Sequence, residues 1–155
     1  MTTTTTIQNR KARFRFFLFE KYEAGIALLG CEVKSIREGK VNLAESFVRV
    51  VKTEAFLFNC HITPYSKIQG HTGIDAVRIR KLLLNRAELD ALHEKMSQKG
   101  YSIVPLQMYF KNGKVKVEIA LGKGKKLQDK REDIKRRLHE RESASAIKHH
   151  QRKGK

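Results

Sequence analysis

The segment Lys111–Leu121, which reads KNGKVKVEIAL, decides the fold of this chain. Asn112-Gly113 is the strongest short-range signal for a β-hairpin, because both residues readily adopt the left-handed backbone of a tight turn. The strand after the turn alternates polar positions with the apolar residues Val115, Val117, Ile119 and Leu121. This alternation is typical of an antiparallel strand with one face in a core and one in solvent. The sequence therefore predicts a hairpin that contributes one face to a hydrophobic core.

Further strands are predicted upstream of this hairpin. Phe14–Phe19 is rich in aromatic residues, and Gly25 breaks the pattern that follows it. Phe47–Val51 and Ala55–Phe58 are β-rich runs separated by a short polar stretch, which predicts a second hairpin. Pro105 indicates that the strand before the Asn-Gly turn begins at an edge or a bulge, because proline has no N–H to donate to a sheet.

Two helices are predicted. Asn85 is a good N-cap for a helix that runs to Lys99, Glu88 completes a capping box, and Gly100 is placed to end the helix. Cys31–Arg37 fits one or two helical turns with a single apolar face. The expected class is mainly β with helices (α+β). The expected fold is a small antiparallel OB-like β-barrel flanked by helices, plus a disordered basic C-terminal tail.

The chain carries a strong positive charge. Its 155 residues include 33 Lys and Arg against 16 Asp and Glu, which gives a formal net charge of +17. A charge of this size calls for a polyanionic partner, most often RNA or DNA.

The composition argues against several other classes of protein. Phe16–Phe19 and Leu82–Leu84 are the longest apolar runs, and both are far too short to span a bilayer. The N-terminal Thr2–Thr6 run lacks the apolar region of a secretory signal. Cys31 and Cys60 form no CxxC motif, so neither a disulfide scaffold nor a cysteine-based zinc site is expected. We expect a cytoplasmic monomer that has no membrane contact, no metal and no cofactor.

The charge divides the chain into two kinds of segment. Residues 122–155 hold 13 Lys and Arg against 5 Asp and Glu, a net charge of +8, and no aromatic residue. A segment so poor in apolar surface cannot offset the entropy of its own ordering. We predict a flexible leader at 1–12, an RNA-binding β-barrel domain at 13–121, and a basic tail at 122–155. The tail is expected to be disordered in the free protein and helical when bound to a partner.

Two basic features suggest contact with nucleic acid. Gly122–Lys126 (GKGKK) lacks the GxxxxGK[ST] spacing of a nucleotide-binding loop, so we favour a flexible stretch that passes close to a phosphate chain. A plain linker is the alternative reading of this segment. Lys114 and Lys116 form a polar strand face that Lys111 and Lys123 extend. A solvated face is ordinary for one strand, but this larger basic patch favours RNA.

No catalytic constellation stands out. Glu23 and Glu32 are not fixed as an acid–base pair, and the six histidines have no metal-ligand spacing. A pair made of His61 with Cys31 or Cys60 stays open, although a free cysteine is more often a buried apolar residue. An enzyme, and hence a catalytic residue, is not expected. The alternatives are a generic structural RNA binder, such as a ribosomal protein with a basic extension, and a nuclease or RNA-modifying enzyme.

Several longer motifs follow one another along nearly the whole chain, from Ile7 into the tail. They are Asn9–Arg13, Tyr22–Leu28, Gly30–Arg37, Ala55–Phe58, Ile62–Pro64, Arg80–Asn85, Gly122–Lys126 and Asp129–Arg131. This ordered set resembles the SsrA-binding protein family, also called small protein B, and the resemblance is highly specific. It implies a bacterial adaptor that binds the tRNA-like domain of transfer-messenger RNA and delivers it to stalled ribosomes for trans-translation. The tail would occupy the empty mRNA channel and decoding centre as a helix in contact with rRNA.

The resemblance also implies which residues act. The positions tied to RNA binding are Asn9, Glu23, Leu83, Lys116 and Gly124, with Lys34, Arg37 and Lys81 as neighbours of that surface. The tail positions tied to the ribosome are Gln128, Asp129, Lys130, Arg131 and Ile147. A glutamate can accept hydrogen bonds from base amino or ribose hydroxyl groups, and a leucine can pack on an exposed base.

Two positions depart from the family pattern. Relatives often carry Trp or Thr where this chain has Cys31, so aromatic packing is not expected there. They often carry His or Tyr where this chain has Gln128, which could hydrogen-bond to rRNA instead of stacking on it.

Overall fold

The Asn112-Gly113 turn joins two strands of 11 residues each, β8 (Tyr101–Lys111) and β9 (Lys114–Gly124). Both turn residues have the left-handed backbone that the sequence predicted, with φ of 51° and 73°. The apolar positions of β9 point into the core, where Val117 and Ile119 are fully buried. The hairpin and its alternation are therefore confirmed.

The structure, a computed structural model, describes residues 5–65 and 73–153. The remaining strands are β1 (Ile7–Gln8), β2 (Phe16–Ile26), β3 (Val41–Asn42), β4 (Phe47–Val51), β5 (Glu54–Phe58), β6 (His61–Ile62) and β7 (Arg80–Leu83). The helices are α1 (Arg10–Arg15), α2 (Gly30–Arg37), α3 (Arg86–Met96) and α4 (Leu127–Lys153).

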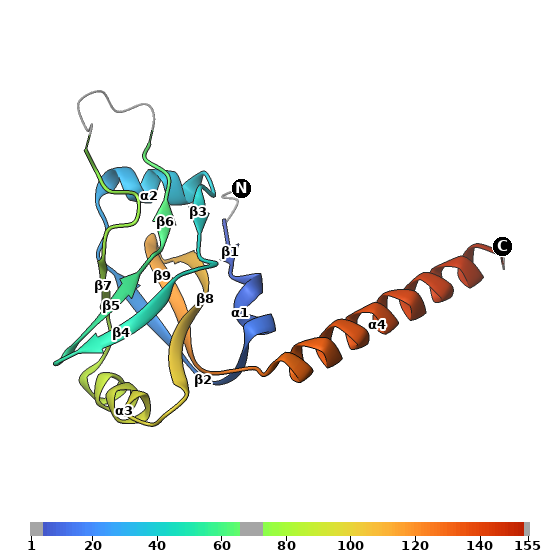
Figure 1. The fold of residues 1–155 in the computed structure, drawn as a ribbon. Coiled ribbons are helices and arrows are strands. Elements are labelled where there is room, and N and C mark those ends of the chain that lie inside the picture. The colour runs from blue at the N-terminus through green and yellow to red at the C-terminus, as the bar shows by residue number, and fades with distance from the viewer. Residues whose placement is uncertain (1–4, 66–72, 154–155) are drawn as a thin grey trace. The chain divides into compact units, whose positions relative to one another are not determined.

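The strands close into a ring. Within the described residues, a seven-stranded antiparallel sheet has the order β1-β8-β4-β5-β7-β2-β9, and β9 also pairs with β8. The strands from β8 through β4, β5, β7 and β2 to β9 therefore return to their starting point (Figure 1). The short strands β3 and β6 pair separately. The predicted α+β class and antiparallel arrangement are confirmed.

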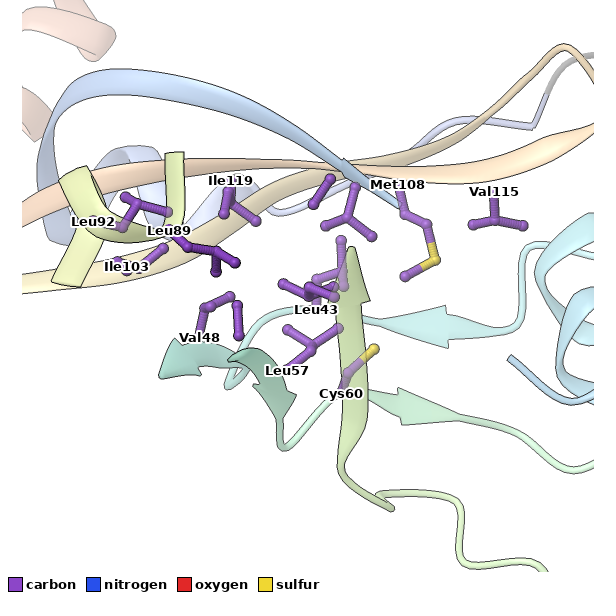
Figure 2. Packing of buried hydrophobic residues seen from close by; sticks show 14 of the residues in the cluster. Leu43, Val48, Leu57, Cys60, Leu89, Leu92, Ile103, Met108, Val115 and Ile119 are labelled. Carbon is purple, nitrogen blue, oxygen red and sulfur yellow. The ribbon is translucent and has the colours of Figure 1, made fainter. Parts of the chain in front are cut away.

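The ring encloses the main hydrophobic core. Val48, Leu57, Ile103, Met108 and Ile119 come from four strands and expose 1% of their surface or less. Figure 2 shows these side chains pointing toward one another, with Leu89 and Leu92 of α3 beside them. Full burial of a large apolar side chain is worth about 1.5–3 kcal/mol, so this core supplies most of the gross stabilisation.

A smaller cluster fixes α1 and shows that the predicted flexible leader is wrong for residues 7–12. Ala12 of α1 packs with Val104, Leu106 and Ala120, which come from β8 and β9. Ile7 and Gln8 form β1, which pairs with Met108 and Gln107 of β8. No local pattern predicts this pairing, because β1 is held by a strand about 100 residues away. Residues 1–4 lie outside the described part of the chain.

Arg80 is fully buried, on the side of β7 that also carries the buried Leu82. Its Nε donates to Glu32 Oε2 at 2.8 Å, and its guanidinium also donates to the Cys60 carbonyl at 2.7 Å. The Arg78 and Ala76 carbonyls accept at 3.1 Å each. Glu32 lies on α2, so this network fixes α2 against β7 and the end of β5.

Several predicted element boundaries agree with the structure. The β4–β5 hairpin pairs Phe47 with Phe58 and Val51 with Glu54. The capping box of Asn85 and Glu88 is present at the start of α3. Pro105 lies at a register shift between β8 and β9, as expected for a bulge.

Three predicted boundaries differ. The strand expected at Phe14 begins at Phe16, because residues 10–15 form α1. Gly25 does not end β2, which continues to Ile26. The helix predicted to run to Lys99, α3, ends at Met96 with Ser97 as its C-cap. Gly100 does have the expected positive φ, at 92°.

The chain divides into two compact units, Met1–Gly124 and Lys125–Lys155. The first unit extends past the predicted end at residue 121 because β9 continues to Gly124. The second unit consists of α4, a helix of 27 residues. Disorder of this tail in the free protein stays a prediction.

Candidate nucleic-acid interface

Two of the residues predicted to bind RNA, Leu83 and Lys116, line the same cleft. The cleft has a volume of about 330 Å³ and lies where β2, β7 and the β8–β9 turn approach α2. Strand register brings the residues together, because Gly25 of β2 is paired with Leu83 on one side and Lys116 on the other. Leu83 thus presents an apolar surface, Gly25 a backbone without a side chain and Lys116 a cation. The three residues form one row across three neighbouring strands.

Gly25 is needed for this row. A Cβ added at Gly25 would lie 3.2 Å from the Leu83 Cβ, so only glycine allows the Leu83 side chain to lie over β2 without a shift. Leu83 itself remains 55% exposed. The cleft therefore offers an exposed leucine on a close-packed backbone, a surface on which a base or ribose can rest.

Glu23 lies two residues before Gly25 and so faces the same side of β2. Its carboxylate accepts hydrogen bonds from the Tyr109 hydroxyl and from Lys111 Nζ, the latter at 3.2 Å. The hydrogen bond from Tyr109, followed by that from Lys111, lowers the pKa of Glu23 below its ordinary value. Burial, together with the Glu23 hydrogen bond, raises the pKa of Tyr109 to about 12, so the phenol remains a donor at neutral pH. Glu23 is therefore an oriented, ionised acceptor beside the cleft.

Tyr109 is a member of the site that sequence reasoning missed. It lies on β8, where it pairs with Lys116, and its hydroxyl reaches across β9 to Glu23 on β2. The available signal was its spacing of two from Lys111, which places both side chains on one face of the strand. That spacing alone could not link Tyr109 to Glu23, because only the strand order shows that β8 and β2 both flank β9.

The basic residues predicted to neighbour this surface occupy two elements. Lys34 and Arg37 lie on α2, where Lys34 approaches the Tyr65 ring at 5.6 Å and Arg37 approaches the Phe110 ring at 5.7 Å. Lys81 lies two residues before Leu83 on the same face of β7 and forms a 2.7 Å ion pair with Glu54. All three are exposed cations with defined orientation.

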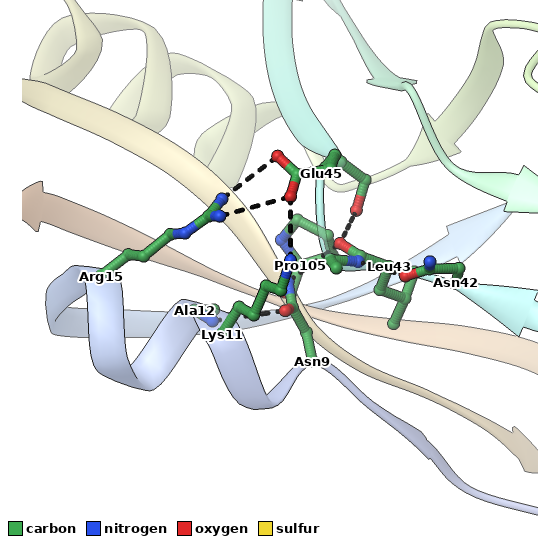
Figure 3. Close-up of polar contacts among 10 residues, drawn as sticks. Asn9, Lys11, Ala12, Arg15, Asn42, Leu43, Glu45 and Pro105 are labelled. Atoms are coloured by element: carbon green, nitrogen blue, oxygen red, sulfur yellow. Dashed lines mark hydrogen bonds and ion pairs between the residues drawn. The ribbon is translucent and has the colours of Figure 1, made fainter.

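Asn9 is placed differently from the other predicted RNA-binding residues, because its side chain is buried. Its Nδ2 donates to the carbonyls of Leu43 at 3.0 Å and Pro105 at 2.9 Å, and its Oδ1 accepts from the Ala12 N–H (Figure 3). Asn9 is thus the N-cap of α1 and connects three segments of the first unit. Any part it has in RNA binding would act through the position of α1 rather than by contact.

Gly124 ends β9 opposite Phe16. A Cβ added there would meet nothing within 4 Å, and its φ is not in the left-handed region. The fold of the first unit therefore does not require glycine at this position.

The predicted ribosome-contacting residues all lie on α4. The helix begins at Leu127, so Asp129 lies in its first turn. The Lys126 N–H donates to Asp129 Oδ2 at 3.2 Å. Asp133 forms ion pairs with Lys125 and with Arg136, the latter at 2.8 Å. Gln128, Lys130, Arg131 and Ile147 are the other predicted positions.

The apolar residues of α4 are exposed. Leu127, Ile134, Leu138 and Ile147 expose between 47% and 67% of their surface. A helix without a buried apolar face gains little from packing and needs a partner to stabilise it.

Cys60 is a buried free cysteine. Burial raises the pKa of Cys60 to about 11, which keeps it a thiol and makes a nucleophilic pair with His61 unfavourable. Within residues 5–65 and 73–153, no group of three or more His, Cys, Asp or Glu side chains is arranged to hold a metal ion. No helix in the same ranges is long and apolar enough to cross a membrane.

Comparison with known proteins gives consistent results. A family model described as SmpB protein matches residues 6–149. An SsrA-binding protein of Pelobacter propionicus is 55% identical over 142 residues, which cover 90% of this chain and 91% of that protein. An SsrA-binding protein of Thermosynechococcus vestitus is 50% identical over 91% of this chain and 93% of its own. A solved structure described as "tmRNA-SmpB: a journey to the center of the bacterial ribosome" matches with a TM-score of 0.68 and 44% identity, covering 83% of this chain and 94% of that one.

Proposed function

The chain belongs to the SmpB protein family, and we propose that it is an RNA-binding adaptor for ribosome rescue. It binds the tRNA-like domain of transfer-messenger RNA and delivers that RNA to stalled ribosomes for trans-translation. Its partners are thus one RNA and the ribosome, and it acts in the cytoplasm. The names of its relatives and of the matching solved structure support this proposal.

The observation that carries the proposal is the cleft row of Leu83, Gly25 and Lys116, with Glu23 beside it. The row combines an apolar platform, a close backbone approach and a cation, and Glu23 adds an oriented acceptor. A base can rest on the leucine while its phosphate meets the lysine, and the carboxylate can accept from an amino group or a 2′-hydroxyl. These contacts read the shape of RNA rather than charge alone.

We propose a separate use for the tail. Residues Gln128, Asp129, Lys130, Arg131 and Ile147 contact the ribosome when α4 occupies the empty mRNA channel and decoding centre. The exposed apolar residues and dense charge of α4 support this use. Apolar side chains gain free energy when a partner buries them, and dense positive charge attracts a polyanion such as rRNA. The protein thereby takes the place of the missing codon–anticodon pairing and performs no bond chemistry.

Binding measurements at matched salt test the proposal. The full-length protein should prefer the tRNA-like domain of transfer-messenger RNA over other structured RNAs of equal length. Equal affinities would instead indicate a generic structural RNA binder, and turnover of RNA by the purified protein would indicate an enzyme.

A variant of the site sharpens this test. Glu23→Ala should weaken binding of the tRNA-like domain about tenfold, the effect of losing one hydrogen bond to a charged group. Glu20→Ala is the matched control, because Glu20 is an exposed carboxylate on the same strand whose partners are Lys95 and Tyr22. Unchanged affinity in Glu23→Ala, or an equal loss in both variants, would contradict the proposed role of Glu23.

A further inference from the structure

The outer face of the β4–β5 hairpin carries aromatic side chains where a solvent-facing strand is ordinarily polar. Val48, Ala55 and Leu57 point into the core and are buried. The alternate positions therefore point outward, and they include Phe47, Arg49, Phe56 and Phe58. We call these four residues the aromatic strip.

The aromatic strip contains a parallel stack. Phe47 and Phe58 are paired across the hairpin, and their rings lie 5.3 Å apart with an angle of 2° between the planes. The Arg49 guanidinium lies over both rings, at 5.2 Å from the Phe47 centroid and 5.9 Å from the Phe58 centroid. A planar cation is thus already held on an aromatic base, with its side chain exposed.

The aromatic strip continues onto β7. Phe56 pairs with Lys81, and Leu83 follows two residues later on the same face. Val51, Ile79 and Leu83 expose 49%, 53% and 55% of their surface. Exposed apolar side chains on neighbouring strands of one sheet face are consistent with an interaction site.

We propose that the aromatic strip binds an unpaired nucleobase of RNA, which stacks on the Arg49 guanidinium. Arginine planes and phenyl rings are the groups on which unpaired bases stack, and Lys81 places a cation for the neighbouring phosphate. The strip shares β7 with the RNA cleft, so the inference rests on the proposed function and extends its interface around the ring. The base belongs to the RNA that occupies the cleft, because Leu83 lines the cleft and lies two residues after Lys81 on the face that the strip continues.

Two substitutions of Arg49 separate stacking from charge. Arg49→Ala should weaken the affinity of the full-length protein for the tRNA-like domain RNA about tenfold. Arg49→Lys should lose nearly as much affinity, because lysine keeps the charge but lacks the plane. Wild-type affinity of Arg49→Ala for this RNA, a loss confined to ribosome binding, or full recovery by Arg49→Lys would overturn the proposal.

A fluorescent reporter tests the contact directly. The chain contains no tryptophan, so Phe58→Trp introduces a single indole into the aromatic strip. Stacking of a base near this indole should quench its emission when the tRNA-like domain RNA binds. If Arg49→Ala weakens RNA binding while the indole is not quenched, no base stacks at the strip and the proposal is wrong.

The same measurements distinguish this inference from the proposed function. Loss of RNA preference in the wild-type protein would contradict the proposed function, whereas the Arg49 and Phe58 results concern only the aromatic strip. Glu23→Ala serves as the reference, because it should affect the tRNA-like domain RNA without changing quenching per bound complex.

Discussion

Arg80 and Glu32 form a buried ion pair that joins α2 to β7. Arg80 is fully buried and Glu32 is 4% exposed, and carbonyl oxygens accept hydrogen bonds from the other two guanidinium nitrogens. Such a pair costs desolvation free energy when it forms, but removal of one partner leaves the other charge buried. Its value at this position is to fix the orientation of α2 beside the cleft.

We therefore expect Arg80→Ala to lower the free energy of unfolding by about 3–5 kcal/mol. Lys81→Ala is the matched control, because its ion pair with Glu54 is exposed and worth about 1 kcal/mol at most. Urea unfolding followed by circular dichroism measures both. Equal, small losses would mean that the buried network contributes little.

Tyr109 positions the Glu23 carboxylate. Tyr109→Phe should raise the pKa of Glu23 toward its ordinary value, because the largest cause of its lowered pKa is removed. In the wild-type protein the carboxylate is lost only when the pH falls through this lowered pKa. In the variant it should be lost at a higher pH, and RNA affinity should fall there with it.

Carboxyl NMR titration and RNA affinity measured against pH check this expectation. Tyr22→Phe is the control, because it removes a similar hydrogen bond, at 2.7 Å, from the hydroxyl to Glu20. If the Glu23 pKa does not change in Tyr109→Phe, Tyr109 is not the group that orients it.

At the scale of elements, β9 carries a glycine near each end for different reasons. Gly113 precedes the strand in the turn with a φ of 73°, a conformation that other residues rarely adopt. Gly124 ends the strand with open space around its Cβ position. The fold requires glycine at position 113. At position 124 the absence of a side chain leaves room for a ligand to approach the backbone.

Alanine substitutions separate these two reasons. Gly113→Ala should destabilise the protein by about 1–2 kcal/mol, because a side chain is strained in the left-handed region. Gly124→Ala should change stability by less than about 0.5 kcal/mol yet weaken RNA binding. Thermal unfolding and RNA affinity give the two readouts. Wild-type RNA affinity in Gly124→Ala would remove the reason to place RNA at this glycine.

At the scale of the whole molecule, the two units divide the charge between two tasks. The second unit, Lys125–Lys155, holds a net charge of +7, and the first unit, Met1–Gly124, holds the other +10. The first unit combines its charge with the cleft, whereas α4 offers charge and exposed apolar residues without a core.

Truncation after Gln128 tests this division. The truncated protein should retain most of its affinity for the tRNA-like domain, because Glu23, Leu83, Lys116 and Gly124 remain. Peptide tagging on stalled ribosomes should fall to background, because the ribosome-contacting helix is absent. Tagging assays and RNA binding with the same preparations provide the comparison, and survival of tagging would contradict the role proposed for the tail.

The sequence by itself determined the features that neighbouring residues encode. The Asn112-Gly113 turn, the alternation of β9, the capping box of α3 and the β4–β5 hairpin were all predicted correctly, because each depends on residues a few positions apart. The charge division is likewise a property of composition. Motif resemblance supplied the predicted site residues, two of which, Leu83 and Lys116, line one cleft.

The tertiary structure decided what depends on distant segments. Asn9 and Pro105 are 96 residues apart in the sequence, and Glu23 and Tyr109 are 86 residues apart. No local sequence pattern therefore predicts either contact. The burial of Arg80, the continuation of β2 through Gly25 and the half-buried stack of Phe47 and Phe58 follow from strand order and register. Local propensity sets which elements form, whereas the closure of the ring sets which of their faces meet.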